Sequence, residues 1–144
     1  MTIKSKSEKQ TIKIGKKISK KLKGGETLAL IGNLGSGKTI FAKGIAKGLD
    51  IKKHITSPTF VLMKVYNLPH NKKNIKYFVH IDAYRLKSGQ SLIDIGVKDW
   101  LNNESAVVAI EWANKVKEIL PRNAKVVNIK QDKKNKEIRK ITIT

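Results

Sequence analysis

The segment GNLGSGKT at residues 32–39 constrains this chain most, because it matches the pattern G-x-x-x-x-G-K-[ST] at every fixed position. A short apolar run at residues 27–31 precedes it, and a helical pattern with Phe41, Ile45 and Leu49 on one face follows it. In a strand–loop–helix unit of this kind, backbone N–H groups of the loop and the helix N-terminus bind phosphate oxygens. The sequence therefore predicts a phosphate-binding loop for a nucleoside triphosphate.

Individual positions of this loop have separate expected roles. Gly32, Gly35 and Gly37 allow backbone angles and a close approach that a Cβ atom would block. Lys38 is expected to reach the β- and γ-phosphates, and the hydroxyl of Thr39 is expected to bind magnesium. The loop thus predicts a triphosphate that binds together with Mg²⁺.

Two acids are candidates for the carboxylate that such a loop needs at the end of a nearby strand. Asp82 ends the run at residues 77–81, and Glu111 ends the apolar run at residues 106–110. We assign Glu111 to magnesium together with Thr39, and Asp82 to the attacking water or to a metal-bound water. The two roles could be exchanged, and either acid could instead cap a neighbouring helix.

Other polar and aromatic residues lie near these acids in the sequence. His80 shares a strand face with Asp82, where a packed, hydrogen-bonded histidine is the favoured interpretation over a catalyst. Trp112 could cover the nucleotide or pack in the core. The hydroxyls of residues 56–59, TSPT, could orient water or metal, or this segment could be a Ser-Pro turn that begins a strand.

The remaining pattern is typical of an α/β protein. The other predicted elements are a helix at 8–23 with a capping box at Ser7 and Gln10, a hairpin of strands 59–68 and 75–83, helical turns at 88–102 and 114–120, and strands at 124–131 and 137–143. Residues 1–6 are expected to be frayed. With 144 residues, 40% of them hydrophobic, we expect one domain over 1–144 and a three-layer P-loop NTPase fold with a mixed, mostly central sheet.

The composition limits the remaining functional classes. The formal net charge is +20, but 28 of the 31 basic residues are Lys, and Lys, Ile and Asn together make up 57 of 144 residues. A/T-rich codons encode all three, so base composition can produce this charge without selection for RNA binding. The chain has no cysteine, no apolar run of roughly 20 residues and no apolar stretch of a signal peptide near its start, which favours a cytoplasmic protein.

Four sequence blocks together resemble the TsaE family, the small ATPase of the bacterial machinery that makes threonylcarbamoyladenosine in tRNA. The blocks are GNLGSGKT at 32–39, TSPTF at 56–60, HIDAYRL at 80–86 and IEW at 110–112, and the resemblance covers about residues 7–143. It implies a cytoplasmic, Mg²⁺-dependent ATPase that acts with the paralogous partners TsaB and TsaD. In that family TsaD performs the transfer, and ATP binding and hydrolysis by the small subunit allow multiple turnover. Direct contact with tRNA is left open.

The resemblance also implies roles for particular residues. ATP would bind through residues 35–40, with Lys38 and Asp82 in hydrolysis and Thr39 and Glu111 at the metal. The residues implied in nucleotide binding are Gly35, Ser36, Gly37, Lys38, Thr39, Ile40, Thr11 and Trp112. Thr59 and Tyr84 correspond to positions near the site. The chain departs from the family at Asn33, Ser36, Ala83 and Ala113, where the family usually has Asp, Ala, Leu and Pro. None of these changes removes a proposed ligand.

Three other functions fit the sequence less well. A GTPase would need an N-K-x-D motif, and residues 135–138 read NKEI, without the Asp. A small-molecule kinase needs a lid and an acceptor site, for which 144 residues leave little room. A non-enzymatic RNA-binding module would explain the charge but not the phosphate loop with its two acids.

Overall fold

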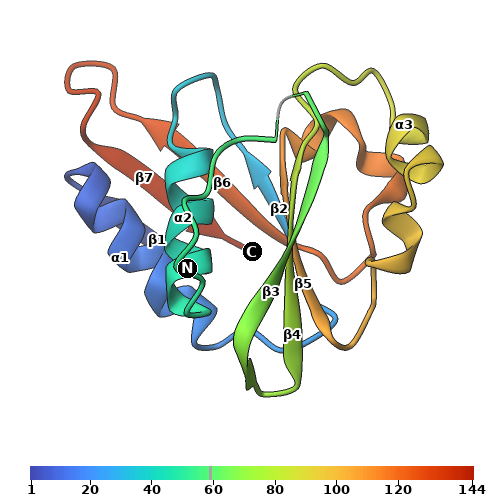
Figure 1. The fold of residues 1–144 in the computed structure, drawn as a ribbon. Helices are drawn as coiled ribbons and strands as arrows, with labels where there is room; N and C mark the ends of the chain where they lie inside the picture. Colours follow the sequence, from blue (N-terminus) through green and yellow to red (C-terminus); the bar gives the residue numbers. More distant parts are fainter. Residues whose placement is uncertain (59) are drawn as a thin grey trace.

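The computed structural model describes residues 1–58 and 60–144 and contains one seven-stranded mixed sheet (Figure 1). The strands are β1 (Thr2–Ser5), β2 (Thr27–Ile31), β3 (Met63–Lys72), β4 (Ile75–Asp82), β5 (Ala106–Glu111), β6 (Lys125–Gln131) and β7 (Arg139–Ile143). Their order across the sheet is β1-β7-β6-β2-β5-β4-β3. The four central strands β6, β2, β5 and β4 are parallel, and the flanking pairs are antiparallel.

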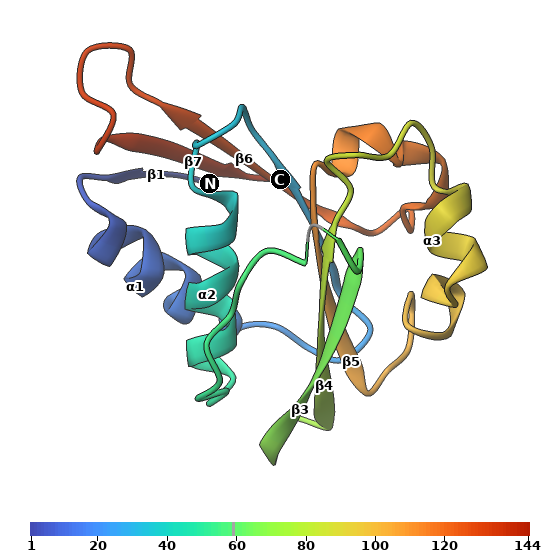
Figure 2. The ribbon, with the colours of Figure 1, turned by 45° about the horizontal axis from the view of Figure 1, so that its top comes forward.

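Helices cover both faces of this sheet, which gives the three layers that the sequence predicts (Figures 1 and 2). On one face lie α1 (Glu8–Ser19) and α2 (Lys38–Gly48); on the other lie α3 (Gln90–Asp94) and the 3₁₀ helices η1 (Val97–Asp99), η2 (Ala113–Lys115) and η3 (Lys117–Ile119). Each face has its own buried apolar core. None of the helices in the described residues has the length and apolar character that a membrane crossing requires.

The contact between α1 and α2 places the helix that follows the phosphate loop. The N-cap half of the predicted capping box is confirmed, because Ser7 Oγ accepts a hydrogen bond from Gln10 N at 3.1 Å. Gln10 Oε1 reaches back to Lys6 N at 2.7 Å, one residue before the N-cap. Gly15 and Gly44 let the two helices touch, since a Cβ on Gly15 would lie 2.6 Å from the backbone oxygen of Phe41. This close packing holds α2 against the rest of the fold.

The start of the chain differs from the prediction. Residues 1–6 are not frayed, because β1 pairs with β7 in the antiparallel register Thr2↔Thr142, and the N-terminal amine donates to the carbonyl of Ile143 at 3.0 Å. Without β1, strand β7 would be an open sheet edge with unpaired backbone groups. The partner strand is about 140 residues away in the sequence, so no local pattern signals this pairing.

Several predicted boundaries also shift. The helix predicted at 8–23 ends at Ser19, and the chain continues through turns in which Lys21 N donates to Ile18 O and Leu22 N donates to Ser19 O. The strand predicted at 59–68 is β3, which starts at residue 63 and runs on to residue 72 with a register irregularity after Asn67. The predicted β3–β4 hairpin is confirmed, and Lys73 and Asn74, both with positive φ, form its turn. The helical stretches predicted at 88–102 and 114–120 are short turns of α3 and 3₁₀ helix.

Candidate functional site

The loop between β2 and α2 has the geometry expected of a phosphate-binding loop. Gly35 and Gly37 adopt left-handed φ values of 75° and 109°, which favour glycine, and a Cβ on Gly35 would meet no atom within 4 Å. Lys38 Nζ donates to the backbone oxygen of Gly32 at 2.7 Å and to that of Asn33 at 2.9 Å. The predicted strand–loop–helix unit is therefore confirmed, and its lysine lies within the curve of the loop.

The ammonium group of Lys38 is buried but lies among favourable partners. Its side chain is nearly inaccessible to solvent, and burial lowers its pKa, while the nearby carboxylates of Glu111 and Asp82 act to raise it. Lys38 Nζ also lies 4.1 Å from the centroid of the Trp112 ring, within cation–π range. The lysine thus faces both acids that the sequence singles out.

Glu111 joins the loop to the sheet. The Thr39 hydroxyl donates to Glu111 Oε1 at 2.7 Å, and His80 Nε2 lies 2.6 Å from Glu111 Oε2. Glu111 is 3% exposed and His80 is fully buried, so the carboxylate is held in one orientation from both sides. The favoured interpretation of His80 as a packed, hydrogen-bonded histidine agrees with this geometry, and its partner is Glu111.

Asp82 lies beside Glu111 at the carboxyl ends of neighbouring parallel strands. The two acids are direct register partners between β4 and β5, and both are buried. Asp82 Oδ1 accepts a hydrogen bond from Tyr84 N at 2.9 Å, and the Ser57 hydroxyl donates to Asp82 Oδ2. The TSPT segment therefore contacts one of the two acids through Ser57, while Thr59 lies outside the described residues.

Trp112 and Tyr84 form an aromatic pair beside the lysine. Their ring centroids are 5.0 Å apart, and Lys115 donates to the backbone oxygen of Tyr84. Trp112 has φ 58° and ψ 36°, a left-handed conformation that is unusual for a residue with a side chain. Such backbone strain persists where the surrounding structure fixes it, and here it turns the ring toward Lys38 immediately after Glu111.

The structure also places the other residues implied in nucleotide binding, Ile40 and Thr11. Ile40 is half-buried in the first turn of α2. Thr11 is fully buried in α1, where its hydroxyl lies 2.8 Å from Ser5 Oγ and donates to the backbone oxygen of Ser7 at 3.2 Å. Its contact with a nucleotide stays a prediction.

Sequence reasoning missed Arg139, which donates from Nε to the backbone oxygen of Ser36 in the loop at 3.0 Å.

The oxygen donors present fit a magnesium ion that accompanies a triphosphate. Mg²⁺ prefers carboxylate, hydroxyl, water and phosphate oxygens, and it binds through one or two protein ligands in such sites. Thr39 and Glu111 supply one hydroxyl and one carboxylate that already touch. Within residues 1–58 and 60–144 no group of three or more His, Cys, Asp and Glu side chains forms a metal cage.

Replacing Glu111 with glutamine tests its assignment to the metal. Glu111→Gln keeps the size but removes the charge and replaces one of the two acceptor oxygens with an NH2 donor, so the gain in ATP affinity that Mg²⁺ provides should fall by about tenfold or more. Titration calorimetry with ATP, in magnesium and in EDTA, measures that gain. Equal affinity losses in both conditions would remove Glu111 from the metal, and the exposed Glu104→Gln serves as the matched control.

Comparison with known proteins agrees with the fold and the motifs. The family model of the threonylcarbamoyl adenosine biosynthesis protein TsaE matches residues 5–141. The tRNA threonylcarbamoyladenosine biosynthesis protein TsaE of Treponema pallidum is 36% identical over 126 residues, which cover 88% of both chains. The protein of the same name from Bacillus subtilis is 36% identical over 109 residues, 76% of this chain and 64% of that relative.

A solved structure resembles the whole fold. The crystal structure of YdiB from Bacillus subtilis superimposes with a TM-score of 0.80 at 29% identity, and the match covers 99% of this chain and 83% of YdiB. The predicted α/β architecture is thereby confirmed along nearly the full length. Together, the family model, the relatives and this match show that the chain belongs to the TsaE family of tRNA threonylcarbamoyladenosine biosynthesis proteins.

Proposed function

We propose that this chain binds ATP with Mg²⁺ and hydrolyses it slowly, as a subunit required for threonylcarbamoyladenosine modification of tRNA next to the anticodon. It would act with TsaB and TsaD and would not itself transfer the threonylcarbamoyl group. One observation carries the ATPase proposal: the phosphate loop, Thr39, Glu111 and Asp82 converge at the carboxyl ends of β2, β5 and β4. Ligands of open α/β sheets bind at this edge of the sheet.

Each residue has a distinct task in the proposed hydrolysis. Lys38, which now donates to the carbonyl groups of its own loop, would instead donate to the β- and γ-phosphates. Thr39 and Glu111 would hold Mg²⁺, which when bound would neutralise charge on the phosphate oxygens. Asp82 would orient the attacking water and accept its proton at Oδ2, the atom to which Ser57 now donates.

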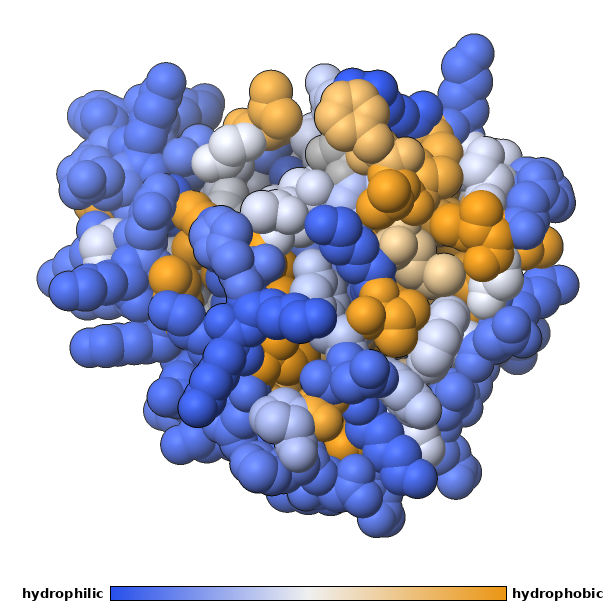
Figure 3. Space-filling view, viewed as in Figure 1, coloured by the Kyte–Doolittle hydropathy of each residue, from blue (hydrophilic) through white to orange (hydrophobic). Residues whose placement is uncertain are grey.

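The surface around the site supports action through partner proteins. Most of the surface in Figure 3 is hydrophilic, while hydrophobic side chains gather in its upper right part. Leu34 in the phosphate loop is 74% exposed, and Phe60, which follows the TSPT segment, is 84% exposed under the guanidinium of Arg85. Contiguous exposed apolar patches mark surfaces that bind other proteins, and we propose that Leu34 and Phe60 belong to such a patch. The partners could thereby sense the nucleotide state directly.

Co-purification and turnover measurements test this proposal. We expect the chain to co-purify with its native TsaB and TsaD, and the amount retained to differ between buffers with and without ATP. We also expect slow ATP hydrolysis by the isolated chain, at a rate that changes when both partners are added. Retention of neither partner, or ATP consumption only with a small-molecule acceptor, would contradict the proposal and favour a kinase.

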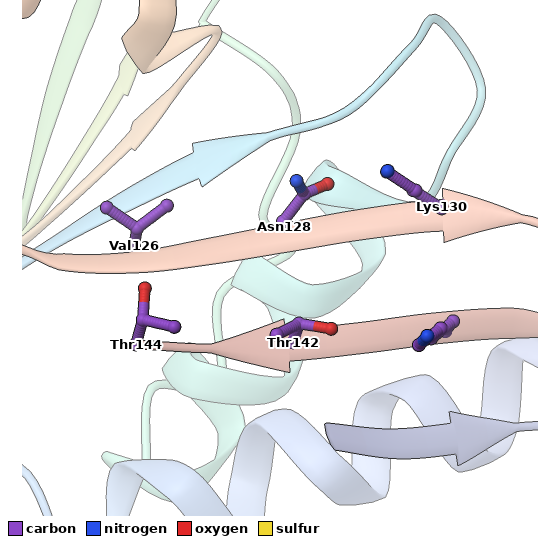
Figure 4. Close-up of a pocket in the computed structure, with 6 residues that line it drawn as sticks. Val126, Asn128, Lys130, Thr142 and Thr144 are labelled. Carbon is purple, nitrogen blue, oxygen red and sulfur yellow. The ribbon is translucent and has the colours of Figure 1, made fainter. Parts of the chain in front are cut away.

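The proposal does not require direct contact between this chain and tRNA. The surface available for such contact is the uncovered face of β6 and β7, where Asn128, Lys130 and Thr142 border a shallow depression of about 280 Å³ (Figure 4). Lys130 and Lys140 border this depression, and Lys4 in β1 is the register partner of Lys140. Phosphate groups would meet positive charge on this face.

A further inference from the structure

The buried guanidinium of Arg139 lies directly against the phosphate loop. Arg139 is the first residue of β7 and is 4% exposed. Its Nε donates to the backbone oxygen of Ser36 at 3.0 Å, and its Nη1 donates to the backbone oxygen of Glu137 at 3.2 Å. The first of these hydrogen bonds spans 103 residues of sequence, so it ties the last strand of the chain to the loop.

The loop and the arginine fit together closely. A Cβ atom on Gly37 would lie 2.8 Å from Arg139 Nε and 3.0 Å from its Cδ, so a larger residue there would displace the guanidinium. Gly37 is therefore required for a second reason besides its positive φ of 109°. Because the Ser36 carbonyl is held by Arg139, that peptide group is fixed in orientation at the point where α2 begins.

The charge of Arg139 has no carboxylate partner in the part of the chain that the structure describes. The ion pairs there join Lys72 to Asp50 and Lys125 to Glu26, and Glu111 is hydrogen-bonded to His80. Arginine stays protonated in proteins, so two carbonyl acceptors leave a full positive charge in place behind the loop. A buried charge is costly without a counter-ion and attracts an anion strongly, because the local dielectric constant is low.

We propose that Arg139 is a positioning residue for the phosphates of the nucleotide. It holds the Ser36 carbonyl away from the ligand so that the neighbouring amides face the phosphates, and its charge adds to that of Lys38 from the opposite side of the loop. This inference rests on the proposed function, because it takes residues 32–39 as the nucleotide site. It extends that site to a residue 100 positions beyond the motif.

Three single variants separate charge from packing. Arg139→Gln removes the charge, Arg139→Lys keeps it, and Lys140→Gln removes a neighbouring charge that borders the depression on the opposite, uncovered face of the sheet. By titration calorimetry with Mg²⁺, we expect Arg139→Gln to weaken ATP binding about tenfold, Arg139→Lys to stay within about threefold of the natural protein, and Lys140→Gln to leave affinity unchanged. Thermal unfolding shows which variants are folded.

The outcomes distinguish this inference from the proposed function. A folded Arg139→Gln protein with unchanged ATP affinity would overturn the inference, and so would an Arg139→Lys protein as weak as Arg139→Gln. If Arg139→Gln does not fold, the Nε–H proton signal of Arg139 in the natural protein provides the test, since it should shift when ADP is added; an unmoved signal would overturn the inference. Failure of the natural protein to bind ATP at all would instead contradict the proposed function.

Discussion

Replacing Lys38 with alanine is expected to remove most of the affinity for ATP. Lys38 Nζ is the buried cation at the centre of the loop, where it donates to two backbone oxygens and faces both site acids. Removing one partner of a buried, hydrogen-bonded charge pair costs about 2–5 kcal/mol, which corresponds to a loss of about 30-fold to 4,000-fold in affinity. Titration calorimetry with ATP and Mg²⁺ measures this loss.

The control for this variant removes a lysine from the same helix. Lys47 lies in the last turn of α2 and is exposed, so Lys47→Ala should bind ATP like the natural protein. The Lys38 ammonium group also holds the loop through its hydrogen bond to Gly32 O, so its loss could unfold the protein. A cooperative thermal transition of Lys38→Ala shows that the variant is folded. A folded Lys38→Ala protein with undiminished ATP affinity would contradict the assignment of the phosphate loop.

Replacing Asp82 with asparagine should stop turnover and spare ATP binding. Asparagine keeps the oxygen that accepts from Tyr84 N but cannot take a proton from water. Loss of a positioned general base lowers the rate by about a hundredfold to ten-thousandfold. Phosphate release measured at saturating ATP gives the rate, and calorimetry gives the affinity, which should change by less than about threefold because the acid acts on water.

An exposed acid of the same type provides the comparison for Asp82. Asp99 in η1 is exposed and lies outside the four motif blocks, so Asp99→Asn should hydrolyse ATP at the natural rate. If Asp82→Asn also hydrolysed ATP at the natural rate, Asp82 would have only its structural contacts with Ser57 and Tyr84. If Asp82→Asn instead lost the gain in ATP affinity that Mg²⁺ provides, Asp82 would be the metal ligand and Glu111 would be the acid that acts on water.

The centre of the site was predictable because its chemistry is local in the sequence. The glycines and Lys38 of residues 32–39 must follow one another for the loop to form, and an acid after an apolar run marks the carboxyl end of a buried strand. Asp82 and Glu111 could therefore be paired before the fold was known, and they are register partners. Apart from β1, the order of helices and strands was predictable from hydrophobic periodicity for the same reason.

Contacts between distant segments could not be predicted in this way. Arg139 follows a polar turn and resembles any basic residue of a surface strand, yet its side chain lies against Ser36. The pairing of β1 with β7 depends on an open sheet edge, which a local pattern does not show. The hydrogen bond between His80 and Glu111 likewise requires the parallel register of β4 and β5.

A crystal structure with Mg²⁺ and a non-hydrolysable ATP analogue tests the central claim most directly. We predict that the triphosphate lies along the backbone amides of residues 32–39, with Lys38 turned from its loop carbonyls to the β- and γ-phosphates and with Mg²⁺ beside Thr39 and Glu111. Nucleotide density at another place on the fold, or no density at a saturating concentration of the analogue, would contradict the account.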